Sequence, residues 1–114
     1  MTSPRAPRAL VAGLAIILVL PLFVAVLGFH KPTWTPVLDL AQTEMCVRDV
    51  GTSHTPLIGL PGRIVYEGNQ GSHPGPLSFY ALAPVYRLFG ATAFGLQMAT
   101  FVLNAGAVVV ALVL

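Results

Sequence analysis

The feature that most constrains this chain is an apolar run at residues 10–29, in which no charged side chain occurs. About 20 helical residues, at a rise of 1.5 Å each, span the roughly 30 Å hydrocarbon core of a bilayer. The run therefore predicts a first transmembrane helix. A cleaved signal peptide is the alternative interpretation, but its apolar part would be unusually long and no clean small-x-small cleavage site follows.

The composition of the whole chain also favours a membrane protein. Of its 114 residues, 55% are hydrophobic and only 9% are charged, which is far from the balance of an average soluble domain. The net charge is +2, yet the six basic residues are spread singly and form no patch, so we expect no nucleic-acid partner. With one cysteine, Cys46, the chain cannot form an intrachain disulfide, and no Cys/His cluster has zinc spacing.

Basic residues set the expected orientation in the lipid bilayer. Arg5 and Arg8 precede the first helix, so the positive-inside rule places residues 1–9 in the cytoplasm and the following loop outside. Two further apolar segments, residues 76–89 and 93–114, are expected to cross the membrane as the second and third helices.

The sequence thus predicts an all-α transmembrane fold. It would be the N-terminal part of a polytopic helical bundle in the plasma membrane, with its segments alternating in, out, in, out. Arg87, near the end of the second helix, would reach the cytoplasmic headgroups, where an arginine costs little. The chain stops at Leu114 inside an apolar run without a polar flank, so we expect the third helix to be truncated and the native protein to continue.

The loop between the first two apolar segments, residues 30–75, holds all the acidic residues of the chain: Asp39, Glu44, Asp49 and Glu67. Thr35-Pro36 is typical of a helix start and Gly51 of a helix stop, so a short surface helix is expected over residues 36–50.

Spacing on this surface helix predicts which side faces the membrane. The expected apolar stripe consists of Leu38, Ala41 and Met45. After the helix, residues 51–75 are rich in Gly, Pro, Ser and Thr and are expected to form an ordered loop, apart from a brief pattern at residues 63–66.

Asp39 is the first candidate for chemistry. It would lie in the first turn of the surface helix, where the positive end of the helix dipole favours an ionised carboxylate. Such an aspartate could act as a base or as a ligand, or simply complement the dipole. Glu44 and Arg48 stand at i and i+4 with the acid first, the order that favours a helix salt bridge. Because Asp39 and Glu44 are about 140° apart around a helix, we do not expect a carboxylate pair.

Arginine and histidine side chains of the loop are the other candidates. Arg48 and Arg63 are suited to gripping a phosphate bidentately, or to contacting lipid headgroups. His54 and His73 could bind a metal or an acceptor, although isolated loop histidines are more often solvated. The chain has no Rossmann glycine fingerprint and no P-loop.

Two stretches in this order resemble the opening of the GT-C membrane glycosyltransferases: DLAQTEMCVRDV at residues 39–50 and SHPGPLSFYALAPVYRLFG at residues 72–90. The sequence is most similar to the bacterial branch related to the lipid A aminoarabinose and protein mannosyl transferases, and to actinobacterial arabinosyl- or mannosyltransferase-like proteins. The resemblance covers nearly all of this chain but only the front of the family, whose members carry many more membrane helices.

The resemblance implies roles for individual residues. Asp39 would act as base toward the acceptor hydroxyl, or bind a divalent cation. Many members carry a second acid directly after the first, and Leu40 stands there in this chain, which weakens the case for a metal. Glu44 and Arg48 match acidic and basic positions of the actinobacterial relatives, and we expect them to bind substrate together with Arg63.

The resemblance also implies a reaction. The turn at residues 73–76 looks like the family's proline-rich turn beside the catalytic loop, which would bring His73 to the substrate. The donor would be a polyprenyl-phosphate-linked sugar, the acceptor a cell-envelope glycan, lipid or protein, and the transfer would invert the anomeric carbon.

Two other functions compete with a glycosyltransferase. A small non-catalytic three-helix membrane protein with a structural or assembly role is the alternative. A transporter fragment ranks last, because the acidic residues lie in the outer loop and transporters usually place such groups near the bilayer midplane.

Overall fold

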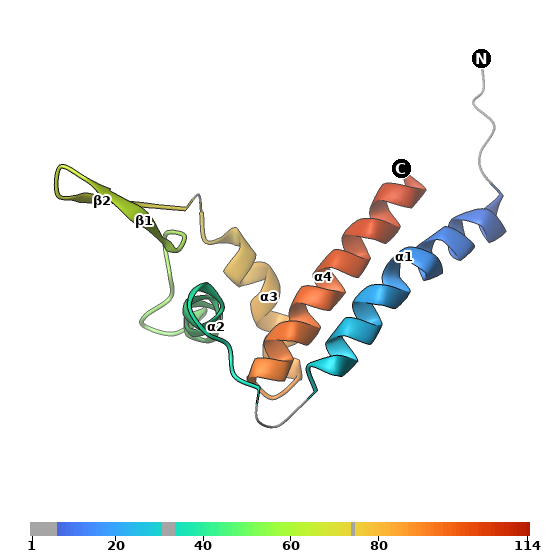
Figure 1. Cartoon of the computed structure of the whole chain (residues 1–114), viewed down its shortest axis with the longest axis horizontal. Helices are drawn as coiled ribbons and strands as arrows, with labels where there is room; N and C mark the ends of the chain where they lie inside the picture. Colours follow the sequence, from blue (N-terminus) through green and yellow to red (C-terminus); the bar gives the residue numbers. More distant parts are fainter. Residues whose placement is uncertain (1–6, 31–33, 74) are drawn as a thin grey trace, which may run out of the picture.

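The computed structural model describes residues 7–30, 34–73 and 75–114. Its elements, in chain order, are α1 (Arg8–Gly28), α2 (Asp39–Asp49), β1 (Pro61–Tyr66), β2 (Asn69–Ser72), α3 (Leu77–Leu88) and α4 (Ala93–Val113) (Figure 1). The prediction of a mostly helical chain is confirmed, but β1 and β2 form a small antiparallel sheet that an all-α fold lacks. Arg5 of the expected cytoplasmic end and Pro74 of the expected turn lie outside the described residues.

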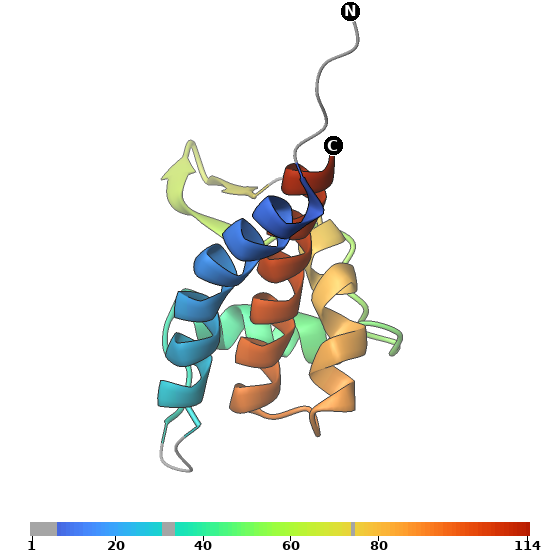
Figure 2. The ribbon, with the colours of Figure 1, turned by 90° about the vertical axis from the view of Figure 1, so that its right-hand side faces the viewer.

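α1 and α4 are long apolar helices that lie side by side in opposite directions (Figure 1 and Figure 2). Each has 21 residues, and in the described part of the chain these two helices are long and apolar enough to cross a membrane. Their contacts run in antiparallel register. The ring centroids of His30 and Phe94 are 4.3 Å apart, and those of Phe23 and Phe101 are 5.8 Å apart. The end of α1 therefore lies beside the start of α4.

α3 covers most of the expected second span and is much shorter than α1 and α4. Its 12 residues rise about 18 Å, against the roughly 30 Å of a hydrocarbon core. Of the three spans expected at residues 10–29, 76–89 and 93–114, the first and third correspond to α1 and α4, the two candidate spans, which run in opposite directions. Four side chains of α3, Phe79, Leu82, Ala83 and Tyr86, pack in a core with α2 and α4, whereas Leu77 and Leu88 stay exposed.

A core of buried side chains joins α2, α3 and α4. Its members are Val47, Phe79, Leu82, Ala83, Tyr86, Leu96 and Ala99. α2 lies crosswise to the other two helices in Figure 2 and buries Val47 and Glu44. Leu38 and Met45, of the stripe expected to face the membrane, lie outside this core and are 78% and 63% exposed.

α2 begins at Asp39 rather than at the expected Pro36. The reason is the backbone of Leu38, whose φ of 52° lies outside the right-handed helical region, so the preceding residues cannot continue the same helix. No side chain caps this end of α2. Asp39 is consequently the first helical residue, and its carboxylate lies at the positive end of the helix dipole.

The segment expected to be an ordered loop contains a β-hairpin. The paired residues are Pro61 with Ser72, Val65 with Gln70, and Tyr66 with Asn69. The two residues of the turn, Glu67 and Gly68, have φ values of 49° and 78°, the positive values that a type I′ hairpin turn requires. The hairpin extends away from the helices (Figure 1).

Candidate functional site

Asp39 and Arg63 form an ion pair that joins the first turn of α2 to β1. They are 24 residues apart in sequence, so the contact is a tertiary one between the start of α2 and the hairpin. The Arg63 guanidinium donates a hydrogen bond to the Asp39 carboxylate. Both side chains stay open to solvent, Asp39 at 60% exposure and Arg63 at 75%.

A polar hollow surrounds this ion pair. It has a volume of about 310 Å³ and is lined by Leu38, Asp39, Gln42, Pro61, Gly62, Arg63 and Gln70. One wall is fixed by the hairpin itself, because Gln70 Nε2 donates to Gly62 O at 2.8 Å. The hollow combines a carboxylate, a guanidinium and two side-chain amides, which are groups that suit a ligand rich in hydroxyls or carrying a phosphate.

The two charged groups of the hollow have complementary chemistry. An ionised carboxylate such as that of Asp39 accepts a proton from a hydroxyl within hydrogen-bond reach. Arg63 carries a permanent positive charge and five donors, which match the oxygens of a phosphate. In the structure each group neutralises the other, so an anion that binds Arg63 would compete with Asp39.

Glu44 and Arg48 form the predicted i, i+4 pair, with Arg48 Nη2 3.2 Å from Glu44 Oε1. The pair lies away from the hollow, because Glu44 is buried and its Oε1 accepts from the Tyr86 hydroxyl at 2.9 Å. Arg48 Nε lies 3.4 Å from the same hydroxyl, and this hydrogen bond raises the pKa of Arg48 above its ordinary value. Neither Glu44 nor Arg48 lines the hollow.

Sequence reasoning missed Tyr86 and misplaced Arg87. A tyrosine in an apolar segment is easily taken for a simple core side chain. The feature that could have identified Tyr86 is its hydroxyl, because a buried hydroxyl needs a hydrogen-bond partner. Arg87, expected at the cytoplasmic headgroups, instead donates to the carbonyl oxygen of Val50 at the C-terminal end of α2. The end of α3 therefore lies beside α2, the helix of the expected outer loop.

His73 lies at the base of the hairpin and is not among the residues that line the hollow. Its side chain is exposed, while its backbone amide donates to Leu60 O at 2.7 Å. Its carbonyl packs on Gly59, where a Cβ would come within 2.2 Å of the oxygen. His54, the other candidate of the loop, is also exposed, with Nδ1 3.3 Å from Ser53 Oγ.

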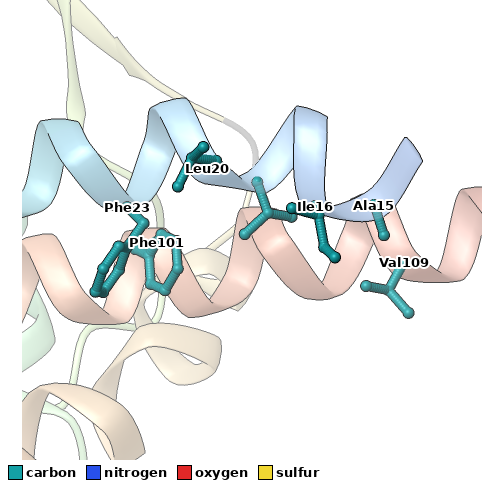
Figure 3. Close-up of a pocket in the computed structure, with 7 residues that line it drawn as sticks. Ala15, Ile16, Leu20, Phe23, Phe101 and Val109 are labelled. Atoms are coloured by element: carbon teal, nitrogen blue, oxygen red, sulfur yellow. The ribbon is translucent and has the colours of Figure 1, made fainter. Parts of the chain in front are cut away.

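Two further hollows lie along the candidate spans. One, of about 370 Å³, runs between α1 and α4 and is lined by Ala15, Ile16, Val19, Leu20, Phe23, Phe101 and Val109 (Figure 3). The other, of about 390 Å³, is lined by Phe29, Trp34, Thr35, Val37, Leu40, Thr43, Leu96, Gln97 and Thr100. Both linings lack a charged side chain, so the chemistry of proton transfer and phosphate binding points to the hollow around Asp39 and Arg63.

Among the described residues, no group of three or more His, Cys, Asp and Glu side chains is arranged to hold a metal ion. The neighbour of Asp39 in the hollow is a cation, Arg63, so the divalent ion implied by the family resemblance gains no support from this geometry. Comparison with family models, with curated proteins and with solved structures found no match. The chemistry of the site therefore has to carry the functional conclusion.

Proposed function

We propose that this chain forms the N-terminal part of an integral membrane glycosyltransferase of the GT-C type. It would transfer a sugar from a polyprenyl-phosphate donor to a glycan, lipid or protein acceptor of the cell envelope. The observation that carries the proposal is the contact between Asp39 and Arg63 in one polar hollow, because it sets a proton acceptor beside a phosphate-binding group. This transfer needs both groups, since the acceptor hydroxyl loses a proton while the donor releases a phosphate.

The antiparallel pair of candidate spans supports a position for the hollow outside the plasma membrane. With Arg8 on the cytoplasmic flank, α1 would leave the cytoplasm and α4 would return to it. The segment between the two spans would then lie on the outer side, with α2 at the surface and α3 packed along the first part of α4. A polyprenyl phosphate would present its headgroup at this surface, the side on which the hollow would lie.

The proposed reaction is a direct displacement at the anomeric carbon of the donor sugar. The acceptor oxygen forms the new bond to that carbon, the bond between the carbon and the phosphate oxygen breaks, and polyprenyl phosphate leaves with the electron pair. Asp39 takes the proton of the acceptor hydroxyl, and Arg63 balances the charge of the departing phosphate. Attack opposite the leaving group inverts the configuration of the sugar.

Donor binding would also release the base from its ion pair. A phosphate that binds Arg63 draws the guanidinium away from Asp39 and leaves the carboxylate free. Both side chains are more than half exposed, so this exchange of partners needs no change in the core. An exposed ion pair contributes only about 0.2–1 kcal/mol, which a phosphate can readily outcompete.

The Asp39→Asn variant tests the proposal in the full-length protein that carries this sequence. In membrane vesicles supplied with a radiolabelled polyprenyl-phosphate sugar, we expect transfer to fall by about 10²–10⁴-fold, the usual contribution of a general base. Asp49→Asn is the matched control, because Asp49 lies on the same helix and does not line the hollow. It should retain transfer.

Protease protection establishes that each variant is inserted normally. Retained transfer by a correctly inserted Asp39→Asn protein would contradict the role of Asp39. Absence of transfer by the unmodified protein, with every polyprenyl-phosphate sugar tried, would instead favour the non-catalytic membrane protein.

A further inference from the structure

The hydroxyl of Tyr86 lies where three parts of the chain meet. The Tyr86 side chain is fully buried in the core of α2, α3 and α4. Its oxygen is 2.9 Å from Glu44 Oε1 on α2 and 2.9 Å from the carbonyl oxygen of Ala91, which belongs to the turn between α3 and α4. Both partners are acceptors, so they share the single hydroxyl proton, and the phenol links α2 to the turn before α4.

Glu44 depends on this bridge. A buried carboxylate is costly unless charged or polar partners replace the water it has lost. Its two hydrogen-bond partners in the structure are Arg48 and Tyr86, and Arg48 is itself 61% exposed. Removal of the Tyr86 hydroxyl would therefore leave the Glu44 carboxylate with Arg48 as its remaining hydrogen-bond partner, on the solvent side, and with no donor on the core side.

The turn that Tyr86 contacts has an unfavourable backbone conformation. Gly90 and Ala91 both have positive φ, 82° and 52°, and for an alanine this conformation is unfavourable. Tyr86 holds the turn twice, because its carbonyl accepts from the Ala91 amide at 3.0 Å and its hydroxyl contacts the Ala91 carbonyl. The position of this turn is therefore coupled to the position of α2.

We propose that Glu44 and Tyr86 are positioning residues, which tie α2 to the turn between α3 and α4 and thereby fix where the first turn of α2 presents Asp39. Glu44 follows Asp39 by about 7.5 Å along the same helix, so a shift of one is transmitted to the other. The catalytic consequence rests on the proposed function, whereas the mechanical coupling does not. Glu44 and Arg48 then act through α2 and do not bind substrate.

Cys46 supplies a reporter for this coupling within the chain. It lies on α2, partly buried against the core that contains Tyr86, and it is the sole cysteine of this sequence. The rate at which iodoacetamide alkylates Cys46, followed on its own peptide by mass spectrometry, measures how firmly α2 is docked. The rate needs no sugar transfer, so it reports the coupling independently of function.

The decisive variant is Tyr86→Phe in the full-length protein, because it removes only the hydroxyl. We expect alkylation of Cys46 to accelerate at least fivefold, and kcat for sugar transfer to fall about tenfold with little change in KM for the donor. Glu44→Gln keeps an acceptor for the Tyr86 hydroxyl, so its Cys46 alkylation rate and its kcat should stay close to those of the unmodified protein. Glu44→Leu removes the acceptor and should change both quantities as Tyr86→Phe does. Tyr80→Phe is the matched control, since the Tyr80 hydroxyl donates to Pro56 O in the loop and not to α2.

The outcomes separate this inference from the proposed function. Unchanged Cys46 alkylation and unchanged kcat in a correctly inserted Tyr86→Phe protein would overturn the inference. Equal damage by Glu44→Gln and Glu44→Leu would overturn the role of the hydrogen bond. Faster alkylation in Tyr86→Phe, in a protein that transfers no sugar in any form, would support the coupling and refute the glycosyltransferase.

Discussion

Gly95 of α4 lies directly against the backbone of Tyr86 in α3. A Cβ on residue 95 would come within 2.9 Å of the Tyr86 carbonyl oxygen, and within 3.2 Å of that of Phe89. The two helices therefore meet backbone to backbone at the point where the Tyr86 hydroxyl reaches toward α2. The close approach sets how α3 packs on α4.

Gly95→Ala should weaken this junction. The added methyl group has backbone oxygens as neighbours, which cannot rotate away as a side chain does, so we expect a loss of about 1–3 kcal/mol, as for other overpacked cores. A thermal unfolding scan in detergent measures the loss as a lower Tm. Gly106→Ala is the control on the same helix, because nothing lies within 4 Å of a Cβ there. The control should keep or raise Tm, since alanine has the higher helix propensity.

Gly59→Ala should open the base of the hairpin. A Cβ on residue 59 would overlap the carbonyl oxygen of His73 at 2.2 Å, so one of the two backbone segments has to move. The hydrogen bond from the His73 amide to Leu60 O would lengthen or break. Hydrogen exchange at the His73 amide should then become faster. Gly71→Ala, in the same hairpin and with no neighbour within 4 Å, should leave the exchange rate unchanged, and equal rates in both variants would contradict the packing.

Cys46 should be a slow nucleophile at neutral pH. Burial raises the pKa of its thiol, and the negative charge of Asp49 raises it further. A higher pKa means that a smaller fraction of the thiol is ionised at neutral pH, and the thiolate is the species that reacts. We therefore expect the alkylation rate to begin rising at a higher pH in the folded protein than in the urea-unfolded chain. Asp49→Asn should lower this pKa and speed the reaction near pH 8, and an unchanged rate profile would rule out the influence of Asp49.

The long apolar helices were predictable because their signal is local. An uncharged run such as residues 10–29 is stable only against lipid or another apolar surface. α1 covers nearly the same residues. α3 shows the limit of the same reasoning. An apolar segment predicts burial but not which surface buries it. The core that α3 forms with Val47 and Leu96 depends on tertiary packing, which hydropathy does not predict.

The candidate site shows a similar division. Asp39 and the Glu44 and Arg48 pair were predictable from helix spacing, which depends on neighbours within one turn or two. The contact between Asp39 and Arg63 was not, because it requires the hairpin, and the strand NQGS has little intrinsic preference for strand structure. The turn residues Glu67 and Gly68 were the overlooked signal, since a glycine there permits the positive φ of a two-residue hairpin.

Exchanging the charges of the ion pair should separate its structural from its chemical role. Asp39→Arg or Arg63→Asp alone sets like charges together and should cost about 0.2–1 kcal/mol, less at high salt, because both side chains are exposed. The double variant restores the attraction, apart from a small penalty for an arginine at the positive end of the α2 dipole. Thermal unfolding of all four proteins at low and high salt measures this cycle.

Sugar transfer by the same four proteins should follow a different rule. The double variant has regained the ion pair, yet it carries no carboxylate at the start of α2 and no guanidinium on β1. If Asp39 is the base and Arg63 the phosphate-binding group, transfer stays lost while stability returns. Transfer that returned together with stability would show that the pair only holds the hairpin to α2, and the base would have to be sought elsewhere in the full-length protein.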